Sequence, residues 1–316
     1  MKNIAYAMVF PGQGSQAVGM MNGLVESPCV RQVYEEASVI LGQDMWAMVT
    51  DASHHEIDLT VNTQPAMLVA GVATWRAWLA QGGCLPAWLA GHSLGEYTAL
   101  VAAGALAFDD ALRLVRLRAE LMQEAVPENT GAMAVILGMN DEAVRQLCRE
   151  AAGKFVLEAV NFNAPGQVVI AGHKPAVELG MVLAKQQGAK RAMMLSVSVP
   201  SHCSLMRPAA DALAQQLANV TIHAPIIPVL HNVDVQSHSD PEGIRTALVR
   251  QLYSPVRWVE TVRKIADEGI VTLAECGPGR VLAGLTKRID SRIEGVALTT
   301  ETALTHYNIS LSVTLH

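Results

Sequence analysis

Charged and aromatic side chains are scarce in this 316-residue chain. Only 16% of the residues are Asp, Glu, Lys or Arg and only 4% are aromatic, whereas 51% are hydrophobic. Such a composition argues against extensive disorder. The net charge is −6 and no long run of basic residues occurs, which argues against a general nucleic-acid-binding protein. The hydrophobic residues are mostly Ala, Val, Leu and Met, which favours an α/β fold with both faces of its sheet covered.

Patterns for disulfides, structural metals and membrane spans are also missing. The five cysteines are odd in number and form no C-x-x-C pair, and no H-E-x-x-H pattern is present. We therefore expect neither a disulfide framework nor a metal site. The first ten residues hold one Lys and a short apolar stretch before Pro11, which predicts a strand and a turn rather than a signal peptide. Glycine, proline and histidine interrupt the uncharged stretch 77–95, so we expect no transmembrane helix and a cytoplasmic protein.

The order of the predicted elements indicates a larger α/β unit interrupted by a smaller one. Residues 128–198 read as β-α-β-β-α-β, the order of a ferredoxin-like unit, and we assign them to an inserted subdomain. Residues 1–127 and 199–316 form the surrounding core. Predicted strands lie at 4–10, 86–90, 132–137, 156–162, 168–171, 191–199, 226–231, 270–274 and 295–298. Predicted helices lie at 30–41, 65–80, 96–103, 109–125, 141–152, 174–187, 206–219, 241–252, 256–268 and 280–289.

Two finer expectations concern the ends of elements. Asp109 is the expected N-cap of the helix 109–125, because a side-chain oxygen at that position can accept from the first free N–H groups. The last dozen residues are polar and show no clear period. We predict a loosely held tail there.

The first chemical candidate is the G-x-S-x-G match Gly91-His92-Ser93-Leu94-Gly95. Alone it is a weak signal, but a buried-type strand precedes it and a helix follows, as a nucleophile elbow requires. In such a turn the serine hydroxyl stands exposed, and the N–H of Leu94 can stabilise a developing oxyanion. The alternative is a glycine-rich turn with an idle serine.

A nucleophilic serine needs a base, and His202 is the preferred candidate. It lies in an uncharged stretch just past a predicted strand, which keeps an imidazole neutral and able to accept a proton. His92 adjoins the serine, but neighbouring side chains in a tight turn usually diverge. No Asp or Glu between Ser93 and His202 announces itself as the group that orients the base, so a backbone or amide oxygen could do so. The alternative for His202 is a satisfied, partly buried histidine.

Two further features bear on the same site. The loop 11–16 is neither G-x-G-x-x-G nor a Walker loop, and its expected role is a backbone turn near the serine that offers a second N–H from Gln13. Arg116 and Arg118 lie on different faces of one apolar helix, so one of them can be turned inward, where a guanidinium needs a carboxylate partner. The alternative is that both reach solvent or pair with Glu120 or Glu124.

Together these motifs resemble the malonyl-CoA:acyl-carrier-protein transacylase family of bacterial fatty-acid synthesis. The resemblance covers the chain to about residue 300, and the tail beyond is this chain's own. Its motifs, in order, are Phe10-Pro11-Gly12-Gln13-Gly14-Ser15-Gln16, Gly91-His92-Ser93-Leu94-Gly95-Glu96-Tyr97, Arg118 followed by Met122, Asn161-Phe162-Asn163 to Gly166-Gln167, Val199-Pro200-Ser201-His202-Cys203, Gln251-Leu252-Tyr253-Ser254-Pro255-Val256 and Gly277-Pro278-Gly279.

The resemblance implies a role for each matching residue. Ser93 would take malonyl from coenzyme A as an ester, and His202 would act as general base and then acid. Gln251 would orient that histidine through a main- or side-chain oxygen, and Arg118 would hold the free malonyl carboxylate. The remaining roles implied are an oxyanion hole from the N–H groups of Gln13 and Leu94, and a place near the substrate for Asn163 and His92. The implied fold is an α/β-hydrolase-like core, with a mostly parallel sheet, that carries the ferredoxin-like insertion.

The resemblance also implies the substrates and partners. The substrates would be malonyl-CoA and the phosphopantetheine arm of an acidic acyl carrier protein. The enzyme would be a monomer without a permanently bound cofactor. Acidic partners should meet basic groups, and the candidates are Lys185, Lys190, Arg191, Lys287, Arg288 and Arg292. Three alternatives remain open: the malonyl transferase subunit of malonate decarboxylase, a serine hydrolase, and a non-catalytic carrier-binding protein.

Overall fold

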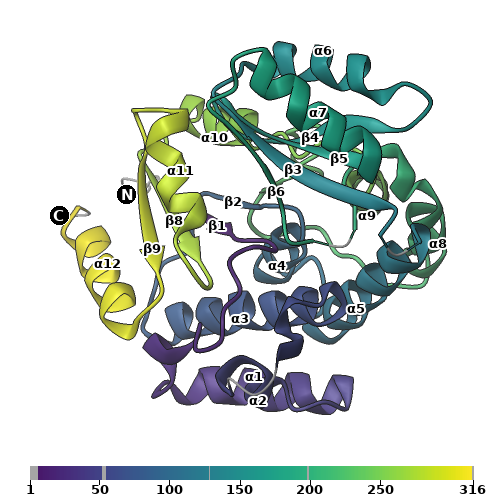
Figure 1. Cartoon of the computed structure of the whole chain (residues 1–316). Coiled ribbons are helices and arrows are strands. Elements are labelled where there is room, and N and C mark those ends of the chain that lie inside the picture. Colours follow the sequence, from purple (N-terminus) through teal and green to yellow (C-terminus); the bar gives the residue numbers. More distant parts are fainter. Residues whose placement is uncertain (1–5, 52–54, 128, 198, 315–316) are drawn as a thin grey trace.

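The computed structural model describes residues 6–51, 55–127, 129–197 and 199–314 (Figure 1). Its larger sheet, sheet A, has the strand order β7-β2-β1-β8-β9, and all of its pairs are parallel. The central strand β1 is buried along its whole length, as its continuous apolar sequence requires in a sheet covered on both faces. The bounds are β1 Tyr6–Phe10, β2 Trp88–Gly91, β7 Val229–Leu230, β8 Thr272–Cys276 and β9 Glu294–Leu298.

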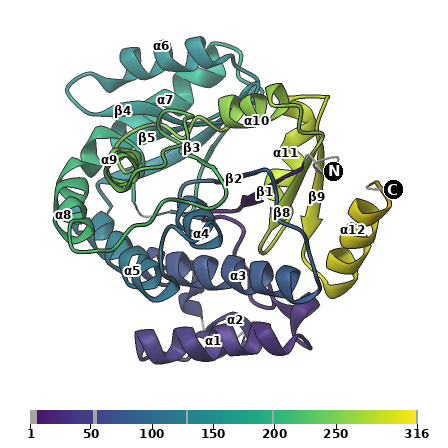
Figure 2. The same ribbon diagram turned by 180° about the vertical axis from the view of Figure 1, so that it is seen from behind.

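Helices cover both faces of sheet A. In Figures 1 and 2, α3 lies on one side of the sheet with α1 beyond it, and α10 and α11 lie on the other side. Phe10 and Met8 of β1 face the first group, whereas Ala7 and Val9 face the second. The bounds on the first side are α1 Pro28–Leu41, α2 Met45–Thr50, α3 Thr60–Ala80, α4 Gly95–Ala102 and α5 Phe108–Ala125. The later helices are α8 Arg207–Leu217, α9 Pro241–Gln251, α10 Trp258–Asp267, α11 Val281–Ile289 and α12 Glu301–Thr314.

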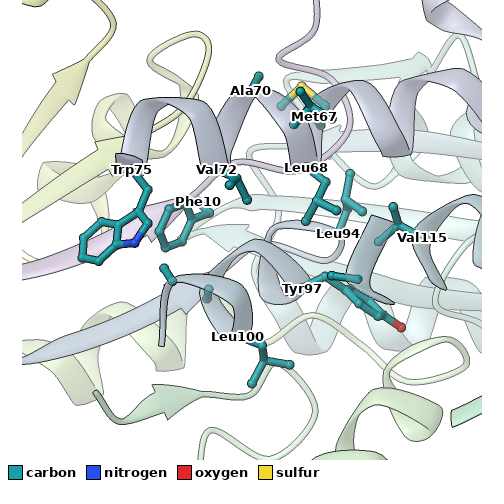
Figure 3. Close-up of a cluster of buried hydrophobic side chains, with 14 of the residues drawn as sticks. Phe10, Met67, Leu68, Ala70, Val72, Trp75, Leu94, Tyr97, Leu100 and Val115 are labelled. Carbon is teal, nitrogen blue, oxygen red and sulfur yellow. The ribbon is translucent and has the colours of Figure 1, made fainter. Parts of the chain in front are cut away.

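The packing of α3 against α4 fixes the turn that carries the serine. Figure 3 shows Val72 of α3 beside Phe10 and Leu68 of α3 beside Leu94, the residue before α4, with Tyr97 of α4 below them. All five side chains are almost completely buried. Removing a buried aliphatic or aromatic side chain costs about 2–5 kcal/mol, so this cluster holds the start of α4 firmly.

The segment between α5 and α8 forms a second sheet, sheet B, which is antiparallel with the order β4-β5-β3-β6. Helices α6 and α7 share a hydrophobic core with it, and the elements follow one another as β-α-β-β-α-β. The bounds are β3 Gly131–Leu137, α6 Asp141–Ala152, β4 Leu157–Ala164, β5 Gln167–His173, α7 Lys174–Gln186 and β6 Arg191–Met194. The α/β fold with a mostly parallel sheet is confirmed. The domain boundaries at 128 and 198 stay a prediction.

Backbone hydrogen bonds join sheet B to the segment before α10. Phe162 N donates to Val256 O at 3.0 Å, and Val256 N donates to Val160 O at 2.8 Å. The outer edge of β4 is therefore paired with a segment of the core beside Asn161.

The predicted tail is wrong. Residues 301–314 form the helix α12, in which Leu304, Tyr307 and Leu311 are buried. The Tyr307 ring meets the Tyr6 ring edge to face, with 5.6 Å between their centroids. These three residues are spaced as on one face of a helix. Three apolar residues in an otherwise polar segment form too narrow a stripe to predict a helix from the sequence.

Some predicted element ends are also wrong. Asp109 is not the N-cap of α5, because Ala107 holds that position and Asp109 lies in the first turn, where it pairs with Arg113 at 2.8 Å. Helix α3 begins at residue 60 rather than 65 and contains a proline. Strand β6 ends at 194 rather than 199, β7 spans two residues rather than six, and the short helix α2 was not predicted.

Among the described residues, no helix combines the length and the apolar character that crossing a membrane requires.

Candidate active site

Ser93 lies in a tight turn between β2, which ends at Gly91, and α4, which begins at Gly95. Its φ of +52° lies in the left-handed region, which is costly for a residue other than glycine. A Cβ on Gly91 would lie 1.9 Å from the carbonyl carbon of Gly95, and one on Gly95 would lie 2.1 Å from Phe10 O. Both glycines are therefore required by the close approach of backbone to backbone.

The structure brings Ser93 and His202 together, although 109 residues separate them. Ser93 Oγ lies 2.7 Å from His202 Nε2, and His202 Nδ1 lies 2.8 Å from the main-chain oxygen of Gln251. Since that carbonyl can only accept, Nδ1 carries the proton and Nε2 is free to accept one from the serine. Burial, followed by the nearby charge of Arg118, lowers the pKa of His202 from 6.5 to about 3. The imidazole is thus neutral at neutral pH.

Gln251 makes contacts with four different groups. Besides its main-chain oxygen on His202, its Nε2 donates to Ser93 O at 3.0 Å and to Glu96 Oε2 at 2.9 Å. Its Oε1 accepts from Arg118 Nη2 at 3.1 Å. Of the two oxygens left open by the sequence, the main-chain oxygen is the one in contact with the histidine.

Arg118 is turned inward and is 1% exposed. Its Nη1 donates to Gln64 Oε1 at 2.8 Å, and its Nη2 lies 3.3 Å from Ser93 Oγ. Burial lowers the pKa of Arg118, while the negative charge of Glu96 acts in the opposite direction. Arg116, two residues away, instead pairs with Glu120 at 2.8 Å and is partly exposed.

Ser93, His202 and Arg118 line one pocket of about 90 Å³. Gln13 and Leu94 lie on its wall with Ser93. That their N–H groups form an oxyanion hole stays a prediction. The apolar part of the wall consists of Met122, Met133, Leu195, Val197 and Val199. A small pocket with a nucleophile, a base and a buried guanidinium suits a short acyl group that carries a negative charge.

His92 and Asn163 contact each other beside the serine. His92 Nε2 lies 2.8 Å from Asn163 Oδ1, and its ring packs at 5.5 Å against the ring of Trp258. Burial lowers the pKa of His92. His92 lines the pocket, whereas Asn163 does not, and Asn161 lies on the wall instead.

Sequence reasoning missed three buried polar residues at the site. Asn232 Oδ1 accepts from Ser93 N at 2.7 Å, Glu96 contacts Gln251, and Gln64 contacts Arg118. Glu96 belongs to the motif that runs from Gly91 to Tyr97, yet helical spacing alone does not reveal its partner Gln251, 155 residues away. Asn232 and Gln64 stand in no pattern that marks them. Their signal is the burial of a polar side chain, which only the structure shows.

Within the described part of the chain, no three His, Cys, Asp or Glu side chains gather so that they could hold a metal ion.

Comparison with known proteins agrees with this geometry. A family model described as an acyl transferase domain matches residues 7–298. The malonyl CoA-acyl carrier protein transacylase of Salmonella typhimurium is 54% identical over 300 residues, which cover 95% of this chain and 97% of the relative. That of Bacillus subtilis is 43% identical and covers 92% of each chain.

Solved structures show the same likeness. The malonyl CoA-acyl carrier protein transacylase of Coxiella burnetii superposes with a TM-score of 0.96 at 48% identity, covering 97% of this chain and 98% of that one. A malonyl-transacylase in complex with a type II PKS acyl-carrier protein gives 0.95 at 52% identity, covering 97% and 99%. The chain therefore belongs to the acyl transferase domain family and, within it, to the malonyl CoA-acyl carrier protein transacylases.

Proposed function

We propose that this protein transfers malonyl from malonyl-CoA to the phosphopantetheine thiol of an acyl carrier protein, through an ester on Ser93. The observation that carries the proposal is the buried guanidinium of Arg118 beside Ser93 Oγ, at 3.3 Å. A hydrolase of uncharged esters has no use for a buried cation there, whereas malonyl carries a free carboxylate. The names of the relatives supply the same acyl group and carrier.

In the first half-reaction, Ser93 Oγ attacks the thioester carbonyl carbon while its proton passes to His202 Nε2. The negative charge that develops on the carbonyl oxygen is stabilised by the N–H groups of Gln13 and Leu94. When the carbon–sulfur bond breaks, His202 gives its proton to the sulfur of coenzyme A. Malonyl remains on Ser93 as an oxygen ester.

The second half-reaction runs the same steps toward the carrier. The phosphopantetheine thiol loses its proton to His202 Nε2 and its sulfur attacks the ester carbonyl. The carbon–oxygen bond breaks, and His202 returns the proton to Ser93 Oγ. The main-chain oxygen of Gln251 stabilises the positively charged imidazole that forms in each half.

Arg118 selects the acyl group. In the free enzyme, its two terminal nitrogens meet the neutral amide oxygens of Gln64 and Gln251. A malonyl carboxylate would add a charge-assisted, bidentate pair, which these neutral partners cannot supply. An acetyl group would leave the guanidinium without a negatively charged partner, so acetyl-CoA binds less well than malonyl-CoA. Coenzyme A and the carrier's arm enter as substrates, and the scheme uses no resident cofactor.

The proposed carrier surface is formed by six exposed basic residues. Arg191 pairs with Leu137 across sheet B, Leu137 pairs with Gln167, and Gln167 Oε1 accepts from Arg288 Nη1 at 2.9 Å. Arg191 of β6 and Arg288 of α11 are thereby connected through the neighbouring strands β6, β3 and β5. Arg292 is different because Asp267 and Asp290 already neutralise it. The six are Lys185, Lys190, Arg191, Lys287, Arg288 and Arg292.

This surface is tested by single substitutions to alanine. Lys287→Ala should raise KM for the carrier and flatten its dependence on salt, because each lost charge removes part of a screened attraction. Arg292→Ala is the matched control and should have the smaller effect. If all six residues can be replaced without a change in carrier KM or in salt dependence, the carrier docks elsewhere.

The reaction itself is tested with labelled malonyl-CoA. Label should appear on Ser93, pass to added acyl carrier protein and be absent from Ser93→Ala. Rapid loss of label to water without transfer would favour a serine hydrolase, and transfer only to the carrier of a malonate decarboxylase would favour that alternative. A binding protein without catalysis would take up no covalent label. We further propose that the protein is cytoplasmic and monomeric. Every group in the scheme comes from one chain, which supports the monomer, and sedimentation should show a single species at about 34 kDa.

A further inference from the structure

Glu96 is a carboxylate buried in the core with no exposed surface, at the first turn of α4. It lies three residues after Ser93, and the scheme above gives it no role. A buried carboxylate is costly unless hydrogen-bond donors surround it. Glu96 has three such donors: His231 Nδ1 at 2.7 Å, Asn232 N at 2.9 Å and Gln251 Nε2 at 2.9 Å.

The contact with Gln251 decides which way that side-chain amide points. Its Nε2 lies between two groups that only accept, Glu96 Oε2 and Ser93 O. A rotation by 180° would place the amide oxygen against both acceptors and the NH₂ group against Arg118. Glu96 therefore keeps Gln251 Oε1 on Arg118, and with it the guanidinium within 3.3 Å of Ser93 Oγ.

The contact with Asn232 reaches the serine from the other side. The main-chain N–H of Asn232 donates to Glu96 Oε2. Its side chain accepts from Ser93 N at 2.7 Å and donates to Gly91 O at 2.7 Å. One carboxylate thus supports both the N–H and the C=O of the strained serine, through two different residues.

Glu96 does not orient the base as the acid of a Ser-His-Asp triad would. His202 Nδ1 is bonded to the main-chain oxygen of Gln251, and the Glu96 carboxylate contacts the side chain of that glutamine. Any effect of Glu96 on the reaction passes through Gln251 or Asn232.

We propose that Glu96 is a positioning residue whose acceptor oxygen, rather than its charge, holds Gln251 and thereby Arg118 in the arrangement that selects a carboxylated acyl group. The inference rests on the proposed malonyl transfer. It assigns the selectivity to a four-residue arrangement of Glu96, Gln251, Arg118 and Ser93, not to the arginine alone.

Three substitutions separate the oxygen from the charge. Glu96→Gln keeps an oxygen where Asn232 N and Gln251 Nε2 donate, and its NH₂ faces His231, whose Nδ1 can accept in the other neutral tautomer. Glu96→Asp keeps the charge but draws its oxygens back by one methylene. Glu96→Ala removes the acceptor.

The measurement is single-turnover loading of Ser93 from malonyl-CoA and from acetyl-CoA. For Glu96→Gln we expect a malonyl rate within about threefold of the unmodified enzyme and an unchanged malonyl-to-acetyl ratio. For Glu96→Asp and Glu96→Ala we expect the malonyl rate to fall by about 10-fold and 100-fold, with the ratio falling in both. If Glu96→Ala does not fold, the other two variants still test the proposal, because Glu96→Gln should load malonyl faster than Glu96→Asp.

Glu275→Gln is the matched control, because Glu275 is equally buried but lies in β8, where it accepts from Ala283 N. It should change thermal stability without changing the ratio. The proposal is overturned if Glu96→Asp matches the unmodified enzyme while Glu96→Gln is impaired, or if the ratio is constant in every folded variant. An unmodified enzyme that loads no malonyl would instead refute the proposed function.

Discussion

Replacing Arg118 with alanine separates recognition of the acyl carboxylate from the chemistry at Ser93. Two terminal nitrogens of the guanidinium are available to a bidentate carboxylate, and they now meet Gln64, Gln251 and Ser93. A hydrogen bond to a charged group contributes about 1.5–3 kcal/mol. Two such bonds amount to about 3–6 kcal/mol, which corresponds to a loss of roughly 10²–10⁴-fold in kcat/KM for malonyl-CoA.

Acetyl-CoA provides the internal comparison. It has no carboxylate, so Arg118→Ala removes no direct contact with it, and its loading should fall by no more than about tenfold. Single-turnover loading from both thioesters, on protein whose folding is checked by thermal melting, gives the two losses. Arg116→Ala is the matched control, because Arg116 is directed to Glu120 and should leave the ratio unchanged. Equal losses for malonyl and acetyl in Arg118→Ala would refute the carboxylate role.

Three other perturbations test the structure. Burial holds the pKa of His202 at about 3 instead of 6.5, so the unfolded chain binds the extra proton between these values. The folded state therefore loses stability as the pH falls from 6.5 toward 3. The rate of malonyl loading should likewise fall on the acid side only below pH 6.5, and a fall that begins at or above pH 6.5 would contradict the assignment of His202 as the base. Gly91→Ala forces a methyl group onto backbone atoms 1.9 Å away and should lower the free energy of unfolding by about 1–3 kcal/mol or more, whereas Gly284→Ala, with open space around it, should not. Tyr307→Ala should cost about 3 kcal/mol in denaturant unfolding, while Ile309→Ala, on the exposed side of the same helix, should cost little; equal values would mean that α12 does not pack as described.

Features encoded by neighbouring residues could be predicted from the sequence. Helix α6 occupies 141–152 as expected, because its apolar residues recur at helical spacing after a side chain that can cap it, Asn140. The elbow around Ser93 was readable because backbone contact excludes any residue but glycine at positions 91 and 95.

Features set by distant contacts could not be predicted. The two-residue strand β7 exists because β2 offers it a partner, and its sequence alone suggested a longer strand. Helix α12 depends on an aromatic cluster with Tyr6 and Trp78 that only the fold assembles. The inward turn of Arg118 was one of two open readings, and its amide partner Gln64 lies 54 residues away.

The pairing of β4 with Val256 bears on how the acyl range of this enzyme could be engineered. Two main-chain hydrogen bonds flank Asn161, which stands on the pocket wall, so that wall cannot swing outward without breaking them. Room for a bulkier acyl chain must therefore come from trimming side chains on the apolar wall, such as Met133 or Leu195.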